Sequence, residues 1–145
     1  MSKASILIAD DDADDRYLLE TAFIEKGYQE KIEFVDNGVE VLNYLSRIKK
    51  DGGENRKLLY PKFILLDLNM PKKDGREVLK EMKANPDFRT IPVIVFTTTK
   101  SENEIKRCYE LGANTYIIKP VSFDALLSVV ENIRSYWLNT ASIPA

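Results

Sequence analysis

Short apolar runs alternate along the whole chain with longer segments in which apolar residues recur at helical spacing. The short runs are SILIA, KIEFV, KFILL, PVIVF and TYIIK, at 5–9, 31–35, 62–66, 92–96 and 115–119. A short, nearly continuous apolar run is typical of a buried strand, whereas apolar residues at a spacing of about 3.6 indicate an amphipathic helix. The pattern therefore predicts five strands that alternate with five helices.

The last of the predicted helices shows its apolar face most clearly. The residues at helical spacing along it are Phe123, Leu126, Leu127, Val130, Ile133 and Trp137. Residue types at the helix ends agree with the pattern, since Ser122 suits an N-cap and Gly112 suits the end of the preceding helix. Ser101 and Glu104 have the spacing of a capping box at the start of that preceding helix.

Strands that alternate with helices imply right-handed crossovers and a parallel sheet. The runs at 5–9, 63–66 and 93–96 are apolar, as strands buried on both faces should be. Glu33 and Lys119 interrupt the second and fifth runs, so these two strands are expected at the edges. The prediction is a three-layer α/β fold of the flavodoxin-like type, with a five-stranded parallel sheet of order 2-1-3-4-5.

The length of 145 residues suits one domain. We expect a single domain over 1–145, with a core from about 4 to 137 and a C-terminal tail at 138–145. The long polar connection KKDGGENRKLLYP, at 49–61, is predicted to be a loop. Because only this tail follows the last helix, no output domain is expected.

Composition narrows the range of functions. The net charge of −2 does not suggest a nucleic-acid partner, and no apolar stretch approaches the roughly 20 residues that cross a membrane. The start of the chain, MSKASILIADDD, has too short an apolar run for a signal peptide. A single cysteine, Cys108, excludes an internal disulfide and fits a reducing cytoplasm. We therefore expect a cytoplasmic protein that binds neither membranes nor nucleic acid.

The chain has no histidine, and this absence is the most informative fact of its composition. It excludes Ser-His-Asp catalysis, metal sites of the HExxH kind and a phosphohistidine on this chain. Any chemistry here must use carboxylates, hydroxyls, lysine or a metal ion bound by oxygen atoms.

Polar residues follow the carboxyl ends of the predicted strands, where ligands bind in open α/β sheets. These residues are Asp10, Asp11, Asp12, Asp67, Asn69, Thr97, Thr98, Lys119 and Pro120. Although they are far apart in the sequence, the sheet should gather them at one edge. The apolar run FILL ends directly on Asp67, and an unpaired buried carboxylate is costly. Its charge must therefore face water, a partner or a metal ion at this edge.

A cluster of carboxylates favours a divalent cation, because neighbouring carboxylates raise one another's pKa values. Mg²⁺ prefers oxygen ligands and retains several of its waters. Asp11 and Asp67 are the predicted direct ligands, with the backbone carbonyl of Asn69 as a third. Asp10 is better placed to act through a metal-bound water, and Lys119 is expected to pair with Asp67 at rest.

Together, these residues resemble the receiver domain of two-component response regulators. The segment LLDLNMPKKDG is similar to the phosphoacceptor segment of that family, and GANTYIIKP is similar to its fifth-strand segment. The resemblance runs from about Ile6 to Ile133. The motifs are highly specific in combination, although an acidic doublet after a strand is common on its own.

The resemblance implies a signalling protein of a two-component phosphorelay rather than an enzyme, with slow self-catalysed phosphorylation and dephosphorylation at most. Asp67 would accept a phosphoryl group from a sensor histidine kinase or a histidine phosphotransfer protein, with Mg²⁺ bound and with Thr97 and Lys119 assisting. Thr97 and Tyr116 would then switch the face formed by the fourth helix, fifth strand and fifth helix toward a downstream target protein. The bond between Lys119 and Pro120 is expected to be cis.

A narrower resemblance concerns the long connection and the YWLNTASIP ending, which are similar to stand-alone receivers that partner phytochrome-type sensor histidine kinases. Some of those receivers form dimers. Tyr136 and Trp137 could complete the core under the last helix or form an apolar patch with Ile143, and aromatic residues are enriched at the cores of interfaces. A homodimer is therefore one hypothesis.

Simpler interpretations exist for the single residues. Asp10 and its two following acids could cap and solvate the first helix, whose N-terminus favours negative charge. Thr97 could be an ordinary strand-end residue, and Lys119 could be a solvated lysine on an edge strand. The coincidence of these residues at one edge of the sheet makes each of these the minority interpretation.

Three other functions are also open. The first is a pseudo-receiver that binds a partner without phosphorylation, which the intact acids and lysine disfavour. The second is an aspartate-nucleophile phosphatase, a class that needs an acid two residues after its nucleophile, where this chain has Asn69. The third is a flavodoxin-like cofactor protein, but the first strand–helix turn holds acids where the phosphate of FMN needs small or hydroxyl residues.

Overall fold

The computed structural model describes residues 6–29 and 31–144. Within them, a five-stranded parallel sheet has the order β2-β1-β3-β4-β5, which confirms the predicted fold class and strand order. The strands are β1 (Ile6–Ala9), β2 (Ile32–Val35), β3 (Phe63–Leu66), β4 (Val93–Thr97) and β5 (Thr115–Ile118). Ser5, which the sequence placed in the first strand, lies outside the described residues.

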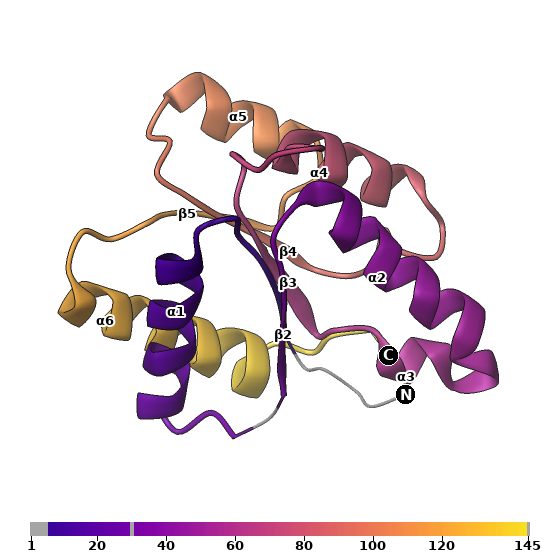
Figure 1. Ribbon diagram of the computed structural model, residues 1–145, viewed down its shortest axis with the longest axis horizontal. Coiled ribbons are helices and arrows are strands. Elements are labelled where there is room, and N and C mark those ends of the chain that lie inside the picture. Colours follow the sequence, from indigo (N-terminus) through magenta and orange to yellow (C-terminus); the bar gives the residue numbers. More distant parts are fainter. Residues whose placement is uncertain (1–5, 30, 145) are drawn as a thin grey trace.

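The helices cover both faces of the sheet in a three-layer arrangement (Figure 1). The helices α1 (Ala13–Glu25) and α6 (Phe123–Ile133) pack together on one face. The other face carries α2 (Gly38–Asp51), α4 (Gly75–Ala84) and α5 (Glu102–Glu110). Each layer of helices buries one hydrophobic cluster against the sheet.

The central strands explain why the sequence shows apolar runs rather than alternation. In β1, Leu7 faces the cluster beneath α2 and α4, whereas Ile8 faces the cluster beneath α1 and α6. Both faces of β1, β3 and β4 are therefore buried, and every residue of these strands is buried. The edge strands β2 and β5 have no fully buried residue, as Glu33 and Lys119 had indicated.

The connection at 49–61 differs from the prediction of a loop. Helix α2 continues to Asp51, and a 3-10 turn, η1 (Gly53–Asn55), leads into the short helix α3 (Arg56–Leu59). Arginine, lysine and leucine have high helix propensity, and Leu59 packs against the hydrophobic cluster beneath α2 and α4. Helix propensity and the burial of Leu59 together therefore favour α3, although Gly52 and Gly53 before it had indicated a loop.

The end of the chain is also more helical than predicted. Helix α6 continues without a break into a π-helical segment, η2 (Arg134–Thr140), which includes the first residues of the predicted tail, 138–140. Trp137 packs against Phe63 with ring centroids 6.3 Å apart, whereas Tyr136 is 54% exposed. Of the two interpretations of these aromatic residues, core packing applies to Trp137. No helix in the described parts of the chain has both the length and the hydropathy to cross a membrane.

Helix ends are set by the residues that the sequence indicated. Ser122 accepts a hydrogen bond from Ala125 N as the N-cap of α6. Gly112 follows Leu111, the C-cap of α5, and adopts a φ of +109°, which glycine tolerates best. The predicted capping box of α5 is only half formed. The Ser101 hydroxyl accepts from Glu104 N, but the Glu104 carboxylate pairs instead with Arg76 of α4, at 2.7 Å and 2.9 Å.

Candidate functional site

The sheet brings the ends of β1, β3 and β5 to one edge. Backbone hydrogen bonds continue one residue beyond each strand, from Asp67 N to Ala9 O at 3.0 Å and from Lys119 N to Thr97 O at 2.8 Å. Because the ladder continues to these residues, their backbone positions are fixed by the sheet and not by flexible loops. The side chains of Asp67 and Lys119, 52 residues apart in the sequence, meet at this edge.

Three aspartates form an acidic cluster at this edge. Oxygen atoms of Asp10, Asp11 and Asp67 all lie within 4.8 Å of one another. Asp10 and Asp67 are buried, at 2% and 6% exposure, whereas Asp11 is exposed. This combination of two buried carboxylates and one exposed carboxylate offers a site for a hard cation that opens to solvent.

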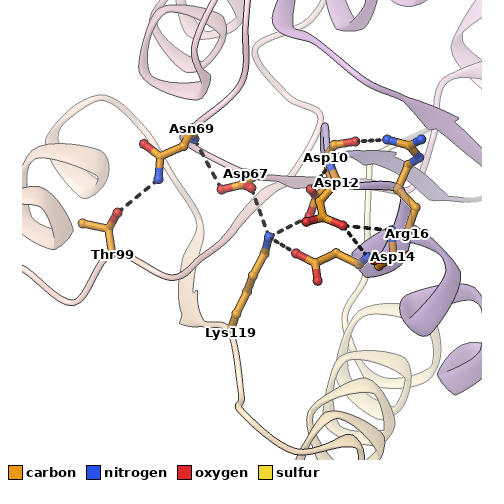
Figure 2. A network of polar contacts seen from close by, with 9 residues as sticks. Asp10, Asp12, Asp14, Arg16, Asp67, Asn69, Thr99 and Lys119 are labelled. Carbon is orange, nitrogen blue, oxygen red and sulfur yellow. Dashed lines mark hydrogen bonds and ion pairs between the residues drawn. The ribbon is translucent and has the colours of Figure 1, made fainter.

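Lys119 is the cation of the site, and it contacts three carboxylates at once (Figure 2). Its Nζ donates to Asp10 Oδ2 at 2.7 Å and to Asp67 Oδ2 at 3.0 Å, as the figure shows. It also donates to Asp15 Oδ2 at 2.9 Å. Burial by itself lowers the pKa of Lys119, but the hydrogen bonds to Asp10 and Asp15 outweigh it and hold the pKa above its ordinary value. Lys119 is therefore an ammonium ion at any physiological pH.

For Asp10, burial has a larger effect on the pKa than the hydrogen bonds do, whereas the hydrogen bonds together outweigh burial for Lys119. Burial raises the pKa of its carboxyl group, and the hydrogen bonds from Lys119 and from Asp12 N counter only part of that rise. The negative charge of Asp67 adds to it. The site therefore holds more negative charge than its one lysine compensates, which favours a further cation.

The turn between β1 and α1 is held by hydrogen bonds that can be followed in Figure 2. Asp12 N donates to Asp10 Oδ1 at 2.9 Å, and Arg16 Nη1 donates to the carbonyl oxygen of Asp10 at 2.7 Å. Asp12 is the N-cap of α1, accepting from Asp14 N and Asp15 N. The simpler interpretation of helix capping thus applies to Asp12, whereas Asp10 is turned into the site.

Asp15 was missed by the analysis of the sequence. It lies three residues after the N-cap Asp12, in the first turn of α1. Helical side chains slant toward the N-terminus, and the N-terminus of α1 faces the site. An acid at this position was therefore a signal, but it is indistinguishable by residue type from one that only solvates the helix.

The loops after β3 and β4 complete the site. Asn69 N donates to Asp67 Oδ1 at 3.3 Å, and its side chain donates to Thr99 Oγ1 at 3.5 Å. Thr97 is fully buried, and its hydroxyl has no hydrogen-bond partner among the described residues. Tyr116 lies on the neighbouring strand β5, and its hydroxyl donates to the carbonyl oxygen of Thr99 at 2.8 Å.

Helix α4 begins unusually close to the backbone that follows β3. A Cβ atom at Gly75 would lie 2.4 Å from the carbonyl oxygen of Asp67 and 2.9 Å from Leu68 Cα. Only glycine permits this approach of the two backbones, and Gly75 N donates to Leu68 O at 2.9 Å. Gly75, the glycine of the segment KKDG, thereby fixes the loop that carries Asn69.

The predicted cis peptide bond is not present. The described residues contain no cis peptide bond, so Lys119 and Pro120 are joined in the trans form. A trans bond before proline is favoured by about 0.5–1 kcal/mol in the absence of other constraints.

A doubly wound parallel sheet that gathers a buried aspartate, two neighbouring acids and a lysine at its carboxyl edge is the architecture of a receiver domain. The family model of the response regulator receiver domain matches residues 6–131, and the chain belongs to this family. Receiver domains are signalling domains of two-component systems and not enzymes in the ordinary sense.

Several known proteins are similar over nearly the whole chain. The probable methanogenesis regulatory protein FilR2 of Methanothrix harundinacea is 40% identical over 133 residues, which are 92% of this chain and 83% of that protein. Response regulator Rcp1 of Synechocystis sp. is 38% identical over 143 residues, 99% of this chain and 94% of that protein.

Solved structures give the same relationship. The phosphorylated cyanobacterial phytochrome response regulator RcpA superposes with a TM-score of 0.86 at 36% identity, covering 99% of this chain and 100% of that chain. The Mn²⁺-bound form of Rcp1 superposes with a TM-score of 0.83 at 35% identity, with the same coverage of 99% and 100%. The predicted membership of the family, including its likeness to phytochrome-associated regulators, is confirmed.

Proposed function

We propose that this chain is the phosphoacceptor of a two-component phosphorelay, in which Asp67 takes a phosphoryl group from a phosphohistidine of a partner kinase. The placement of Asp67 is the observation that supports this most. Asp67 is a buried residue, at 6% exposure, and its carboxylate lies 3.0 Å from Lys119 Nζ and belongs to the acidic cluster with Asp10 and Asp11. A nucleophile at this position has a cation on one side and a metal-binding set on the other.

The proposed transfer is a single displacement at phosphorus. An Oδ atom of Asp67 attacks in line with the bond from phosphorus to the imidazole nitrogen of the donor. That P–N bond breaks, its electron pair remains on the imidazole, and the nitrogen takes up a proton from solvent. Asp67 becomes an acyl phosphate, a known form of covalent intermediate. Since these 145 residues include no histidine, the donor histidine lies outside them.

The residues around Asp67 fit Mg²⁺, because every potential ligand is an oxygen atom and the cluster has an excess of negative charge. Asp11 and Asp67 would bind it directly, the main chain of Asn69 would offer a carbonyl oxygen, and Asp10 would act through a water. When bound, the ion would neutralise charge on the transferred group. The Mn²⁺-bound form of the relative Rcp1 supports the binding of a divalent cation.

The switch proposed for the phosphorylated state uses Thr97 and Tyr116. The buried Thr97 hydroxyl lacks a partner in the described structure, and an acyl phosphate would give it an acceptor. The phosphoryl group adds about −1.5 to −2 charges at neutral pH. Movement of Thr97 would pull the following loop, to which Tyr116 is tied through Thr99 O. The face of α5, β5 and α6 would then change for a downstream target protein.

The partners are proposed from the same chemistry. A sensor histidine kinase or a histidine phosphotransfer protein would supply the phosphoryl group. The phytochrome-associated relatives favour a phytochrome-type sensor histidine kinase. A homodimer is a separate proposal, for which the exposed ring of Tyr136 offers contact surface. Light scattering at high concentration, with and without a phosphodonor, tests it, and a monomeric mass in both conditions would contradict it.

The first experiment is intact mass spectrometry after incubation with acetyl phosphate, with and without Mg²⁺. We expect one phosphoryl adduct on the wild type that requires Mg²⁺ and is absent from Asp67→Asn. Asp124→Asn is the matched control, because Asp124 is an exposed acid in the first turn of α6. It should accept the phosphoryl group as the wild type does.

Two results would change the proposal. An adduct that persists in Asp67→Asn would place the nucleophile elsewhere. No adduct on the wild type, together with no Mg²⁺-dependent binding of beryllofluoride, would favour the pseudo-receiver. Binding of beryllofluoride without a lasting adduct would instead indicate rapid hydrolysis of the acyl phosphate.

A further inference from the structure

Lys119 uses all of its hydrogen-bond donors on carboxylates. A lysine ammonium has three N–H groups, and Lys119 Nζ donates to Asp10, Asp15 and Asp67 at 2.7, 2.9 and 3.0 Å. A phosphoryl group on Asp67 needs a donor from Lys119 to neutralise its oxygens. One of the three carboxylates must therefore release Lys119 when the phosphoryl group arrives.

The three carboxylates differ in how easily they can do so. The side chains of Asp10 and Asp67 are 3% and 8% exposed, whereas that of Asp15 is 39% exposed. A buried carboxylate that loses its partner pays a large desolvation penalty. Asp15 can turn to water instead, because a carboxylate with this exposure is readily hydrated. Phosphorylation also removes the charge of the Asp67 carboxylate, so its hydrogen bond from Lys119 can pass to the new group, and a further donor for that group comes most readily from the bond to Asp15.

We propose that Asp15 is a positioning residue that holds Lys119 in the resting state and competes with the phosphoryl group for its ammonium. This inference rests on the proposed function of Asp67. In the exchange, Lys119 Nζ gives up the hydrogen bond to Asp15 and donates to a phosphoryl oxygen. No covalent bond changes, and Lys119 remains an ammonium ion throughout.

The proposal explains why an additional acid lies beside the site at all. Asp15 is outside the cluster of Asp10, Asp11 and Asp67 that could hold a metal ion, so its contact in the structure is with the lysine. Asp15 orients Lys119 toward Asp67 before the transfer. After the transfer, it weakens the interaction of Lys119 with the phosphoryl group on Asp67. Removing it should therefore favour the phosphorylated state.

The chain offers a close control in Asp14. Asp14 precedes Asp15 in the same helical turn and is exposed. Its backbone N–H donates to Asp12 Oδ1, but its side chain makes no hydrogen bond or ion pair within the described residues. Substitutions at Asp14 and Asp15 therefore remove the same charge from the same helix end, and only one of them removes a contact with Lys119.

The experiment measures the dissociation constant of beryllofluoride by ¹⁹F NMR at saturating Mg²⁺, on the wild type and on four variants. These are Asp15→Asn, Asp15→Ala, Asp14→Asn and Asp14→Ala. We expect both Asp15 variants to bind about five-fold more tightly than the corresponding Asp14 variants, which equals about 1 kcal/mol. The alanine variants matter because an asparagine amide could itself donate to the anion. Thermal unfolding without beryllofluoride checks that all four variants fold.

The outcomes separate this inference from the proposed function. If the wild type binds beryllofluoride but the Asp15 variants match the Asp14 variants within about two-fold, Asp15 does not compete for Lys119. Weaker binding by both Asp15 variants would also overturn the inference, because the contact would then assist the phosphorylated state. If neither the wild type nor any of the four variants binds beryllofluoride, the proposed function itself fails.

Discussion

The hydroxyl of Tyr116 donates to the backbone carbonyl of Thr99 across 2.8 Å, and this bond ties the edge strand β5 to the loop that follows Thr97. The backbone N–H of Tyr116 in turn donates to the hydroxyl oxygen of Tyr109 in α5, at 3.1 Å. One residue thus connects the loop beside the acceptor with both the strand and the helix of the proposed output face.

Tyr116→Phe should loosen this connection. The variant keeps the ring but leaves Thr99 O without its donor, so we expect a loss of about 1 kcal/mol in the free energy of unfolding. Amide hydrogen exchange of residues 98–101 should become faster in the variant. Tyr136→Phe is the control, since the Tyr136 ring is 54% exposed. Equal exchange rates in the wild type and in Tyr116→Phe would show that the hydroxyl does not restrain the loop.

Mg²⁺ should stabilise the protein by binding only its folded form. At a concentration of about 100 times the dissociation constant, such binding adds about 2.7 kcal/mol to the free energy of unfolding. We expect the melting temperature of the wild type to rise with Mg²⁺ and to fall again after a chelator is added. In Asp11→Asn, which removes an exposed carboxylate of the cluster, most of this rise should vanish, while Asp124→Asn should retain it. A full rise in Asp11→Asn would exclude Asp11 as a ligand.

The stability of the metal-free protein should depend on the ionisation of Asp10. Burial raises the pKa of Asp10 above its ordinary value of 3.8, and the hydrogen bond from Lys119 lowers it only in part. The folded state therefore binds the proton more tightly than the unfolded state. Stability should decrease as the pH rises from the ordinary value through the raised one, and then level off.

Asp10→Asn tests this dependence, because asparagine cannot ionise but keeps an oxygen that can accept from Asp12 N, as Asp10 Oδ1 does at 2.9 Å. Urea unfolding in the presence of a chelator, at about pH 4 and about pH 7, should show the variant gaining stability over the wild type at the higher pH. A variant that is less stable than the wild type by the same amount at both values would mean that the contact with Lys119 outweighs burial.

The strands and the location of the site could be predicted from the sequence because both follow from burial. Apolar runs marked β1, β3 and β4, which are buried on both faces, while Glu33 and Lys119 marked the edges. Parallel strands place their carboxyl ends together, so the meeting of Asp10 and Asp67 with Lys119 followed from the strand order alone.

Other features depended on geometry that residue types do not encode. By residue type, Asp15 is an ordinary acid in the first turn of a helix. Its role depends on the hydrogen bond from Lys119, which only the folded structure brings close to it. Helix α3 follows two glycines that favoured a loop, and the packing of Leu59 decides its structure. The bond before Pro120 is trans, the form that an X–Pro bond favours on its own, and not the cis form that the family resemblance implied.

Lys83 should support the fold without taking part in the chemistry. Its Nζ donates to the carbonyl oxygens of Arg89 and Ile91, at 3.1 Å and 3.2 Å, and to Asn114 Oδ1 at 3.5 Å. Burial lowers the pKa of Lys83 below its ordinary value of 10.5. The unfolded state then binds the proton more tightly between these two values, so stability should rise with pH across that interval.

Lys83→Met retains the apolar stem but removes the three donated hydrogen bonds, and we expect a loss of about 1–3 kcal/mol in the free energy of unfolding at neutral pH. The rise in stability at alkaline pH should disappear with it. Lys80→Met, an exposed change in the same helix, is the control. Both variants should accept a phosphoryl group from acetyl phosphate at the rate of the wild type, and a slower rate in Lys83→Met alone would connect this residue to the site.

The surface beside Lys119 should contact the protein that donates the phosphoryl group. Val121 is fully exposed and Leu18 is 41% exposed, and both line a hollow between α1 and α6 together with Lys119. The proposed donor would cover this apolar surface as it brings its phosphohistidine to Asp67, and exposed apolar patches mark such contacts.

Leu18→Ser and Val121→Ser should therefore slow phosphoryl transfer from an autophosphorylated partner kinase about ten-fold, which corresponds to about 1.4 kcal/mol. Labelling by acetyl phosphate should stay unchanged, because a small donor does not need the apolar surface. Ile24→Ser is the matched control, since Ile24 is 62% exposed on the same helix but lies six residues, or about 9 Å, beyond Leu18 along the axis. If Ile24→Ser slows the kinase as much as the other two variants, the donor contacts α1 as a whole. If all three variants also lose labelling by acetyl phosphate, the apolar residues support the site itself and not its partner.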